Sequence, residues 1–268
     1  MAINALQSAA SGMSALNTQL DVISNNLANV NTPGFKASRA NFQDLLYVQR
    51  SQPGTRNEIG DTRPIGTFVG LGVKVAGTQQ NFKQGAFINT DRELDVAIQG
   101  AGFFQVQMPD NVPGSVGFTR SGSLALNQDN ELVLANDQGR RLQPPVTLPA
   151  NATSVSIDSD GQVFVSIPGD QTPQLVGQIN ISVFVNPAGL EPLGENIWAQ
   201  SEASGPPQEG TPNSDNRGQL LQNFLENSNV DPTEELINLI RTQRAFEMNS
   251  NTIRAADEAL RTASNLRR

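Results

Sequence analysis

Apolar residues recur every seven positions at both ends of the chain, and this period constrains the fold more than any other feature of the sequence. Near the N-terminus the steps alternate between three and four residues, which is the seam of a coiled-coil helix. The seam consists of Leu6, Ala9, Met13, Leu16, Leu20, Ile23, Leu27 and Val30. Pro33 and Gly34 then favour a turn, so we expect an N-terminal coiled-coil segment over residues 1–34.

The C-terminal segment carries a second seam, which is preceded by a helix start. Asp231 is a suitable N-cap, and Pro232 suits the first helical position. The seam residues, again seven apart, are Leu239, Phe246, Ile253 and Leu260. Their companion row is partly polar, which predicts a narrower seam. We expect a second coiled-coil helix over residues 231–268.

The N-terminal helix carries no charge before Asp21. An uncharged helix either has a weakly polar surface or is surrounded by protein or lines a narrow channel, where unpaired charges are costly. Burying the seam against a single partner helix does not offset the entropy of ordering the segment. We therefore expect this helix to be loose in a monomer and ordered in an assembly.

Between the two ends the apolar period changes to two, which is typical of strands. One hairpin is expected where two alternating runs flank the turn at residues 158–161. Further strands are expected at residues 103–106, 132–134 and 178–185. The sequence thus predicts an α+β protein whose all-β outer domain spans residues 74–200. Residues 35–73 are expected to connect as an extended or hairpin segment, and residues 201–230 as a linker.

Composition excludes several classes of function. The 268-residue chain has a net charge of −8, which disfavours nucleic acid as a partner. It contains neither Cys nor His, which removes disulfides and the commonest zinc ligands and nucleophile–base pairs. No apolar run reaches the roughly 18 residues of a membrane span, so membrane insertion is not expected. Composition does not exclude a hydrolase that uses paired carboxylates. The acidic pair Glu93 and Asp95 is, however, interpreted as exposed charges on a strand.

Residues 24–36 contain a motif that identifies a family. They read SNNLANVNTPGFK and closely resemble the signature near the N-terminus of flagellar rod and hook proteins. Residues 95–104, 118–124 and 234–250 are similar to further parts of that family. The signature positions are Asn26, Leu27, Ala28, Asn29, Thr32, Pro33, Gly34 and Phe35.

The resemblance implies a structural subunit rather than an enzyme, with no catalytic residue, metal or cofactor. Such a subunit leaves the cytoplasm unfolded through the flagellar type III export gate, without a cleaved signal peptide. It then polymerises in the periplasm as part of the basal body, with the terminal helices as inner tube. Its implied partners are copies of itself, the proximal rod protein, the hook protein, and the P-ring and L-ring proteins.

Within the family, the chain length and residues 45–73 resemble the distal-rod branch. A proximal rod or hook subunit is the alternative inside the family, and a peptidoglycan hydrolase is the alternative from another class. The resemblance also implies an export-gate element at Phe42 and Leu46, although these residues could instead pack as a helical pair four apart. A segment that bridges adjacent subunits is implied at Tyr47, Gln52, Pro53, Gly54, Arg63 and Pro64.

Overall fold

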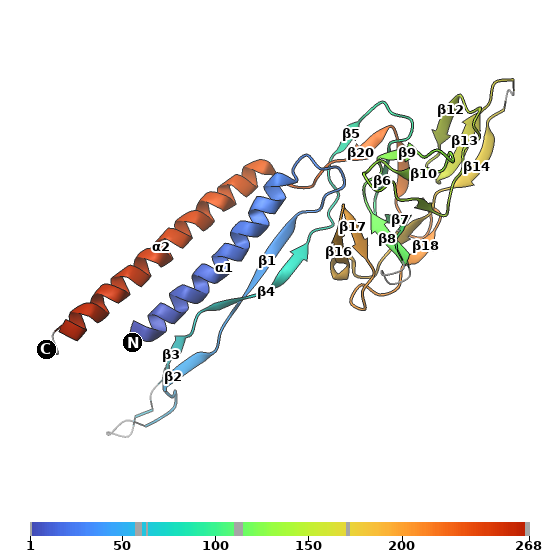
Figure 1. Ribbon diagram of the computed structural model, residues 1–268. Helices are drawn as coiled ribbons and strands as arrows, with labels where there is room; N and C mark the ends of the chain where they lie inside the picture. Colours follow the sequence, from blue (N-terminus) through green and yellow to red (C-terminus); the bar gives the residue numbers. More distant parts are fainter. Residues whose placement is uncertain (1, 57–60, 63, 110–114, 170–171, 266–268) are drawn as a thin grey trace. The chain divides into compact units, whose positions relative to one another are not determined.

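The structure, a computed structural model, describes residues 2–56, 61–62, 64–109, 115–169 and 172–265. The chain divides into two compact units, which we call the helical unit and the β unit (Figure 1). The helical unit comprises Met1–Ala28, Ser38–Gln80 and Asp231–Arg268. The β unit comprises Asn29–Ala37 and Asn81–Val230. Each unit is therefore assembled from segments that are distant in the sequence.

Two long helices form one layer of the helical unit. Helix α1 spans Ala2–Ala28 and helix α2 spans Pro232–Asn265, and they lie side by side (Figure 1). Asp231 caps α2 as expected, since its Oδ1 accepts hydrogen bonds from Thr233 N at 2.8 Å and Glu234 N at 3.3 Å. The α+β class is confirmed, whereas the coiled-coil packing of an inner domain stays a prediction.

A long antiparallel hairpin, here called the ribbon, forms the rest of the helical unit. Strand β1 (Ser38–Asp44) pairs with β4 (Val73–Gln80), and β2 (Tyr47–Ser51) pairs with β3 (Thr67–Gly70). Backbone hydrogen bonds from Leu45 N to Gly72 O and from Leu71 N to Leu46 O join the two pairs. The ribbon therefore continues to Gln80, beyond residue 74 where the β domain was expected to begin, because β4 pairs with β1.

The described residues of the β unit form short antiparallel strands. A sheet runs in the order β16-β17-β8-β7-β15-β18, with β11 also paired to β7, and a second sheet contains β12-β13-β14. Separate pairs are β9 with β10, β6 with β19 and β5 with β20. The strands are β5 Phe87–Asn89, β6 Val96–Gln99, β7 Phe103–Gln107, β8 Val116–Thr119, β9 Leu124–Leu126, β10 Leu132–Leu134, β11 Leu142–Gln143, β12 Ser154–Ile157, β13 Gln162–Ser166, β14 Gln174–Gln178, β15 Ile181–Val183, β16 Glu191–Gly194, β17 Ile197–Ala199, β18 Gln208–Gly210, β19 Gln219–Gln222 and β20 Phe224–Glu226, with the 3-10 helix η2 at Pro187–Gly189.

The core of the β unit is closed. Its centre contains fully buried side chains such as Ile98, Phe104 and Leu124. A separate aromatic cluster surrounds Trp198, whose ring packs edge-on against Phe82 at 5.3 Å. Because Trp198 is the sole tryptophan of the sequence, its fluorescence reports on this unit alone.

The hairpin expected around residues 158–161 is confirmed, because β12 and β13 pair across that turn. The expected linker at residues 201–230 is wrong, since this part of the chain includes β18, β19 and β20. These strands are too short to show a period of two, and their partners lie far away in the sequence. Among the described residues, no helix is long and apolar enough to cross a membrane.

Candidate functional site

The two long helices pair in antiparallel fashion. A Cβ added at Gly12 would lie 3.0 Å from Asn249 Nδ2, and Asn26 Nδ2 donates to Glu235 Oε1 at 2.9 Å. In both pairs the two residue numbers add up to 261. Residues of α2 beyond about 259 therefore have no counterpart on α1, which begins at Ala2.

This register accounts for the burial of the predicted seams. Ile23 is buried and the other N-terminal seam residues within α1 are at least partly covered, as are Leu239, Phe246 and Ile253 on α2. Leu260 is 40% exposed, because it lies beyond the start of α1. Val30 lies outside the helix, since α1 ends at Ala28 and the following residues form a turn. The partly covered residues of the N-terminal seam are Leu6, Met13, Leu16, Leu20 and Leu27.

Helix α2 has a second apolar face that the sequence analysis missed. Leu236, Ile237 and Ile240 are 47%, 45% and 51% exposed. Since a helix turns about 100° per residue, they lie away from the side marked by buried Thr242. We call these three residues the open face of α2. Leu236 and Ile237 precede Ile240 by four and three residues, a spacing typical of one helix face. The face was not predicted because the seven-residue period alone was used to assign the apolar side of this helix.

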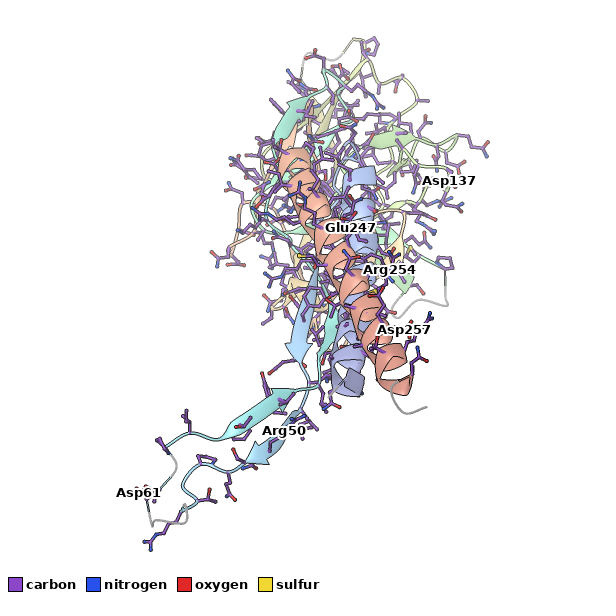
Figure 2. The ribbon with its side chains drawn as sticks, turned by 90° about the vertical axis from the view of Figure 1, so that its left-hand side faces the viewer. Arg50, Asp61, Asp137, Glu247, Arg254 and Asp257 are labelled. Carbon is purple, nitrogen blue, oxygen red and sulfur yellow. The ribbon has the colours of Figure 1, made fainter. Side chains whose placement is uncertain are left out.

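The later turns of α2 are charged. Figure 2 shows Glu247, Arg254 and Asp257 along this helix, and Arg261 Nε pairs with Asp257 Oδ2 at 3.0 Å. About three turns beyond Ile237, Met248 is 64% exposed on the same side of the helix, so exposed apolar surface continues among these charges. A chain with a half-covered seam and an exposed apolar face has surface available for another helix.

Asn26, a signature residue, fastens α1 to the rest of the helical unit. Its side chain is 1% exposed and exchanges two hydrogen bonds with the backbone of Ser38, at 2.8 Å to Ser38 O and 2.9 Å from Ser38 N. The third bond, to Glu235, reaches α2. One amide thereby joins the end of α1 to the start of the ribbon and the start of α2.

The signature residues from Asn29 to Phe35 form a tight turn inside the β unit. Thr32 N donates to Asn29 O and Phe35 N donates to Thr32 O, both at 3.2 Å. Gly34 has a φ of +74°, and a Cβ there would lie 2.7 Å from Ser121 N, so glycine is required. Pro33 O accepts a bond from Asn196 at 3.1 Å. Of the other signature residues, Leu27 is half-buried and Ala28 exposed.

Lys36, the last residue of the signature segment, belongs to a buried cluster of charges with Arg120 and Glu226. Lys36 Nζ lies 2.6 Å from Glu226 Oε1, and both side chains are 0% exposed. Arg120 Nε lies 3.0 Å from Glu226 Oε2, with 5% of the Arg120 side chain exposed. We call these three residues the buried charge cluster. No sequence pattern predicted this cluster, because its members are far apart along the chain.

Backbone groups complete the cluster. Lys36 Nζ donates to Lys83 O at 2.8 Å, Gly85 N donates to Glu226 Oε1 at 2.9 Å, and Arg120 Nη1 donates to the carbonyl oxygens of Gly100 and Gly102. Burial lowers the pKa values of both the Lys36 ammonium and the Arg120 guanidinium, and the charge of Glu226 opposes that effect. Glu226 is therefore the anion on which two buried cations depend.

The ribbon is exposed over most of the expected bridging segment. Tyr47 is 58% exposed, and Gln52, Pro53, Gly54 and Pro64 are also exposed. Arg63 lies outside the described residues. At the joint between its two strand pairs the ribbon contacts α1 closely, because Ser11 Oγ accepts a bond from Val73 N at 3.3 Å and a Cβ at Gly72 would overlap the Ser11 side chain.

Phe42 and Leu46 do not form a helical pair. Phe42 lies in strand β1, and Leu46 lies in the joint between β1 and β2. They are 39% and 82% exposed. The helical alternative is wrong because residues 38–51 pair with residues 67–80 as a ribbon.

Glu93 and Asp95, the acidic pair considered as candidate hydrolase residues, make contacts that support the fold. Glu93 Oε2 accepts a hydrogen bond from Val155 N at the edge of β12. Asp95 is 1% exposed, rather than exposed as expected, and lies 3.4 Å from Arg92 Nη1. Within the described ranges, no group of three Asp or Glu residues could hold a metal ion.

Three protein-family models match the chain. The model described as "Flagella basal body rod protein" matches residues 6–36, "Flagellar hook protein FlgE/F/G D1 domain" matches residues 97–165, and "Flagellar basal body rod FlgEFG protein C-terminal" matches residues 221–266. The matched regions contain most of α1 and the signature turn, much of the β unit, and all of α2.

Individual relatives extend the match to nearly the whole chain. "Flagellar basal-body rod protein FlgG" of Buchnera aphidicola is 44% identical over 255 residues, which cover 95% of this chain and 96% of that protein. The protein of the same name from Caulobacter vibrioides is 42% identical and covers 99% and 100%. "Flagellar hook protein FlgE" of Salmonella typhimurium is 27% identical over 421 residues, covering 97% and 99%.

Proposed function

The chain belongs to the flagellar hook and basal-body rod protein family, and we propose that it is a structural subunit of the distal rod. The family is structural rather than enzymatic. Copies of the chain polymerise helically into a hollow periplasmic shaft, which transmits torque from motor to hook and passes exported subunits. Support comes from relatives named basal-body rod proteins at more than 40% identity over nearly the full length.

The open face of α2 is the observation that carries self-assembly. Leu236, Ile237 and Ile240 present apolar surface that the single chain leaves in water. Burial of apolar surface contributes about 25 cal/mol per Å², so helices of neighbouring copies stabilise an assembly by covering this face. The half-covered seam of α1 adds further apolar surface to the same helical unit.

The test is a charge on the open face. We expect Ile240→Glu to prevent polymerisation of the full chain, because a buried unpaired carboxylate is costly. Asn251→Glu is the matched control, since Asn251 is exposed on the charged part of the same helix. Sedimentation and electron microscopy measure the polymer, and Trp198 fluorescence checks that the β unit is folded. Polymers of Ile240→Glu that match the wild type would contradict the proposal.

The proposed neighbours are other copies of the chain, the proximal rod protein below, the hook protein above, and the P-ring and L-ring proteins around the shaft. A proximal rod or hook subunit is the alternative within the family. The longer alignment with the hook protein favours a rod, because that relative requires 421 aligned positions for a chain of 268 residues. A reconstruction of the intact basal body with this chain traced in it distinguishes these positions.

We assign the ribbon the role of bridging adjacent subunits. Tyr47, Gln52, Pro53, Gly54 and Pro64 expose side chains or backbone that the chain itself does not cover. Phe68, on the strand opposite, is 51% exposed as well. A hairpin with aromatic side chains in water gains stability by packing on a neighbour.

We further propose that Phe42 and Leu46 engage the type III export gate while the chain is unfolded, and that no signal peptide is cleaved. A chain in transit presents local sequence alone, so a short pair of apolar residues is a suitable recognition element. The pair lies close to the N-terminal signature, outside the β unit.

The peptidoglycan hydrolase is the candidate from another class. The contacts of Glu93 and Asp95 with neighbouring backbone and side chains argue against it. A zymogram of the purified protein separates the two functions, because a structural rod subunit leaves the peptidoglycan layer intact.

A further inference from the structure

The buried charge cluster joins three distant parts of the sequence. Lys36 and Glu226 are 190 residues apart, and Arg120 lies between them. Each residue comes from a different segment of the β unit. Lys36 ends the signature turn, Arg120 directly follows strand β8, and Glu226 ends strand β20. The cluster can therefore form only when almost the whole β unit is present.

The segment that contains Glu226, residues 219–227, also completes two strand pairs. In the described parts of the chain, β6 is paired with β19 and β5 with β20. Gly34 N also donates to Glu226 O at 2.8 Å, and Asn227 N donates to Ala86 O at 2.8 Å. Residues 219–227 thus supply hydrogen-bond partners for segments that precede them by more than a hundred positions.

Folding of the β unit depends on Glu226 more strongly than hydrogen bonds alone would require, because Glu226 is the counter-ion of two buried cations. In a folded β unit without Glu226, Lys36 and Arg120 would be two buried cations facing each other without a counter-ion. Removing one partner of a buried ion pair is far more costly than the net value of the pair, because the remaining charge stays desolvated. A β unit folded before residue 226 arrives is therefore strongly disfavoured.

We propose that the buried charge cluster makes folding of the β unit conditional on residue 226, so that the unit stays open while the chain is in transit. The biological role rests on the proposed function, which requires export of an unfolded chain. Whichever end of the chain leads, Lys36 and Glu226 must reach the same side of the membrane before the cluster can close. The cluster thereby couples completion of transfer to folding.

The first test is Glu226→Gln in the full-length chain, at a concentration where it is monomeric. We expect the ratio of unfolded to folded β unit, followed by Trp198 fluorescence in guanidinium, to rise about 100-fold or more. Glu195→Gln is the matched control, because Glu195 pairs with Arg140 at 3.0 Å on the surface and is 38% exposed. We expect the control to change the ratio less than about fivefold.

The second test separates an unpaired charge from lost packing. Adding Lys36→Met to Glu226→Gln removes one of the two unpaired cations. The ratio of unfolded to folded β unit should therefore be at least about tenfold lower in the double variant than in Glu226→Gln. A role in hydrogen bonding or packing alone predicts a double variant at least as unstable as Glu226→Gln.

The proposal is overturned if Glu226→Gln behaves like Glu195→Gln, or if Lys36→Met worsens the effect of Glu226→Gln. These measurements concern the dilute monomer and do not depend on rod assembly. A wild-type chain that fails to polymerise would contradict the proposed function while leaving this inference standing.

Discussion

The β unit buries most of its large apolar side chains in a core of its own, although Leu175 and Val185 are exposed, whereas the helical unit buries few of its own. Buried apolar residues described in the helical unit are Ala9, Ala15 and Ile23, while the β unit contains a large core around residues such as Phe104. The ribbon and α2 instead expose Leu46, Phe68 and Ile240. The difference teaches that the core of the β unit forms within one chain, while the helical unit leaves the apolar surface that the proposed assembly would cover.

The largest expected effect comes from charging the α1 seam. Leu20→Asp should abolish polymerisation, because the seam is the surface that assembly is expected to bury. The unfolding transition of the β unit, followed by Trp198 fluorescence, should stay unchanged. Leu20→Met conserves the side-chain volume and serves as the control, with polymers expected. If Leu20→Asp also destabilised the β unit, the two units would not be independent.

The converse experiment truncates a core residue of the β unit. Phe104→Ala should reduce the free energy of unfolding of this unit by about 3–5 kcal/mol, since Phe104 is 0% exposed. Guanidinium titration followed by Trp198 fluorescence measures this change. Truncation of exposed Phe68 to Ala, followed by amide hydrogen exchange of the helical unit because Trp198 does not report on it, should cost that unit less than about 1 kcal/mol. Equal losses at both sites would contradict the contrast between the units.

Deleting residues 49–65 should change the shape of the polymer rather than the stability of either core. The deletion removes the distal part of the ribbon, so we expect subunits that still assemble but form a shaft that bends. Electron microscopy of the polymers measures their curvature. Straight, stiff polymers of the deleted chain would show that the ribbon does not brace adjacent subunits.

The smallest expected effect on the folded protein comes from Phe42→Ala combined with Leu46→Ala. Both side chains are exposed in the ribbon, so their removal should leave monomer stability nearly unchanged. If they serve export, the secreted amount should fall while the protein accumulates in the cytoplasm. Immunoblots of the two fractions give the answer, and normal secretion with impaired assembly would leave only a packing role.

Local patterns determined much of this protein. The seven-residue period fixed both helices, Asp231 and Pro232 fixed the start of α2, and the turn at residues 158–161 fixed the hairpin of β12 and β13. These features depend on neighbours within a few residues, and such interactions are encoded in short stretches of sequence. Residues 24–36 likewise identified the family without any structure.

Tertiary structure decided the remainder. Helix α2 extends past the start of α1, which exposes Leu260 although it continues the seam. Strands β19 and β20 lie where a linker was expected. They were not predicted because their partners β6 and β5 lie about 120 and 140 residues earlier. Glu226 reads as an ordinary surface charge in the sequence, yet it is buried between Lys36 and Arg120. Pairing over such separations depends on which distant segments the folded chain brings together, and no local period records it.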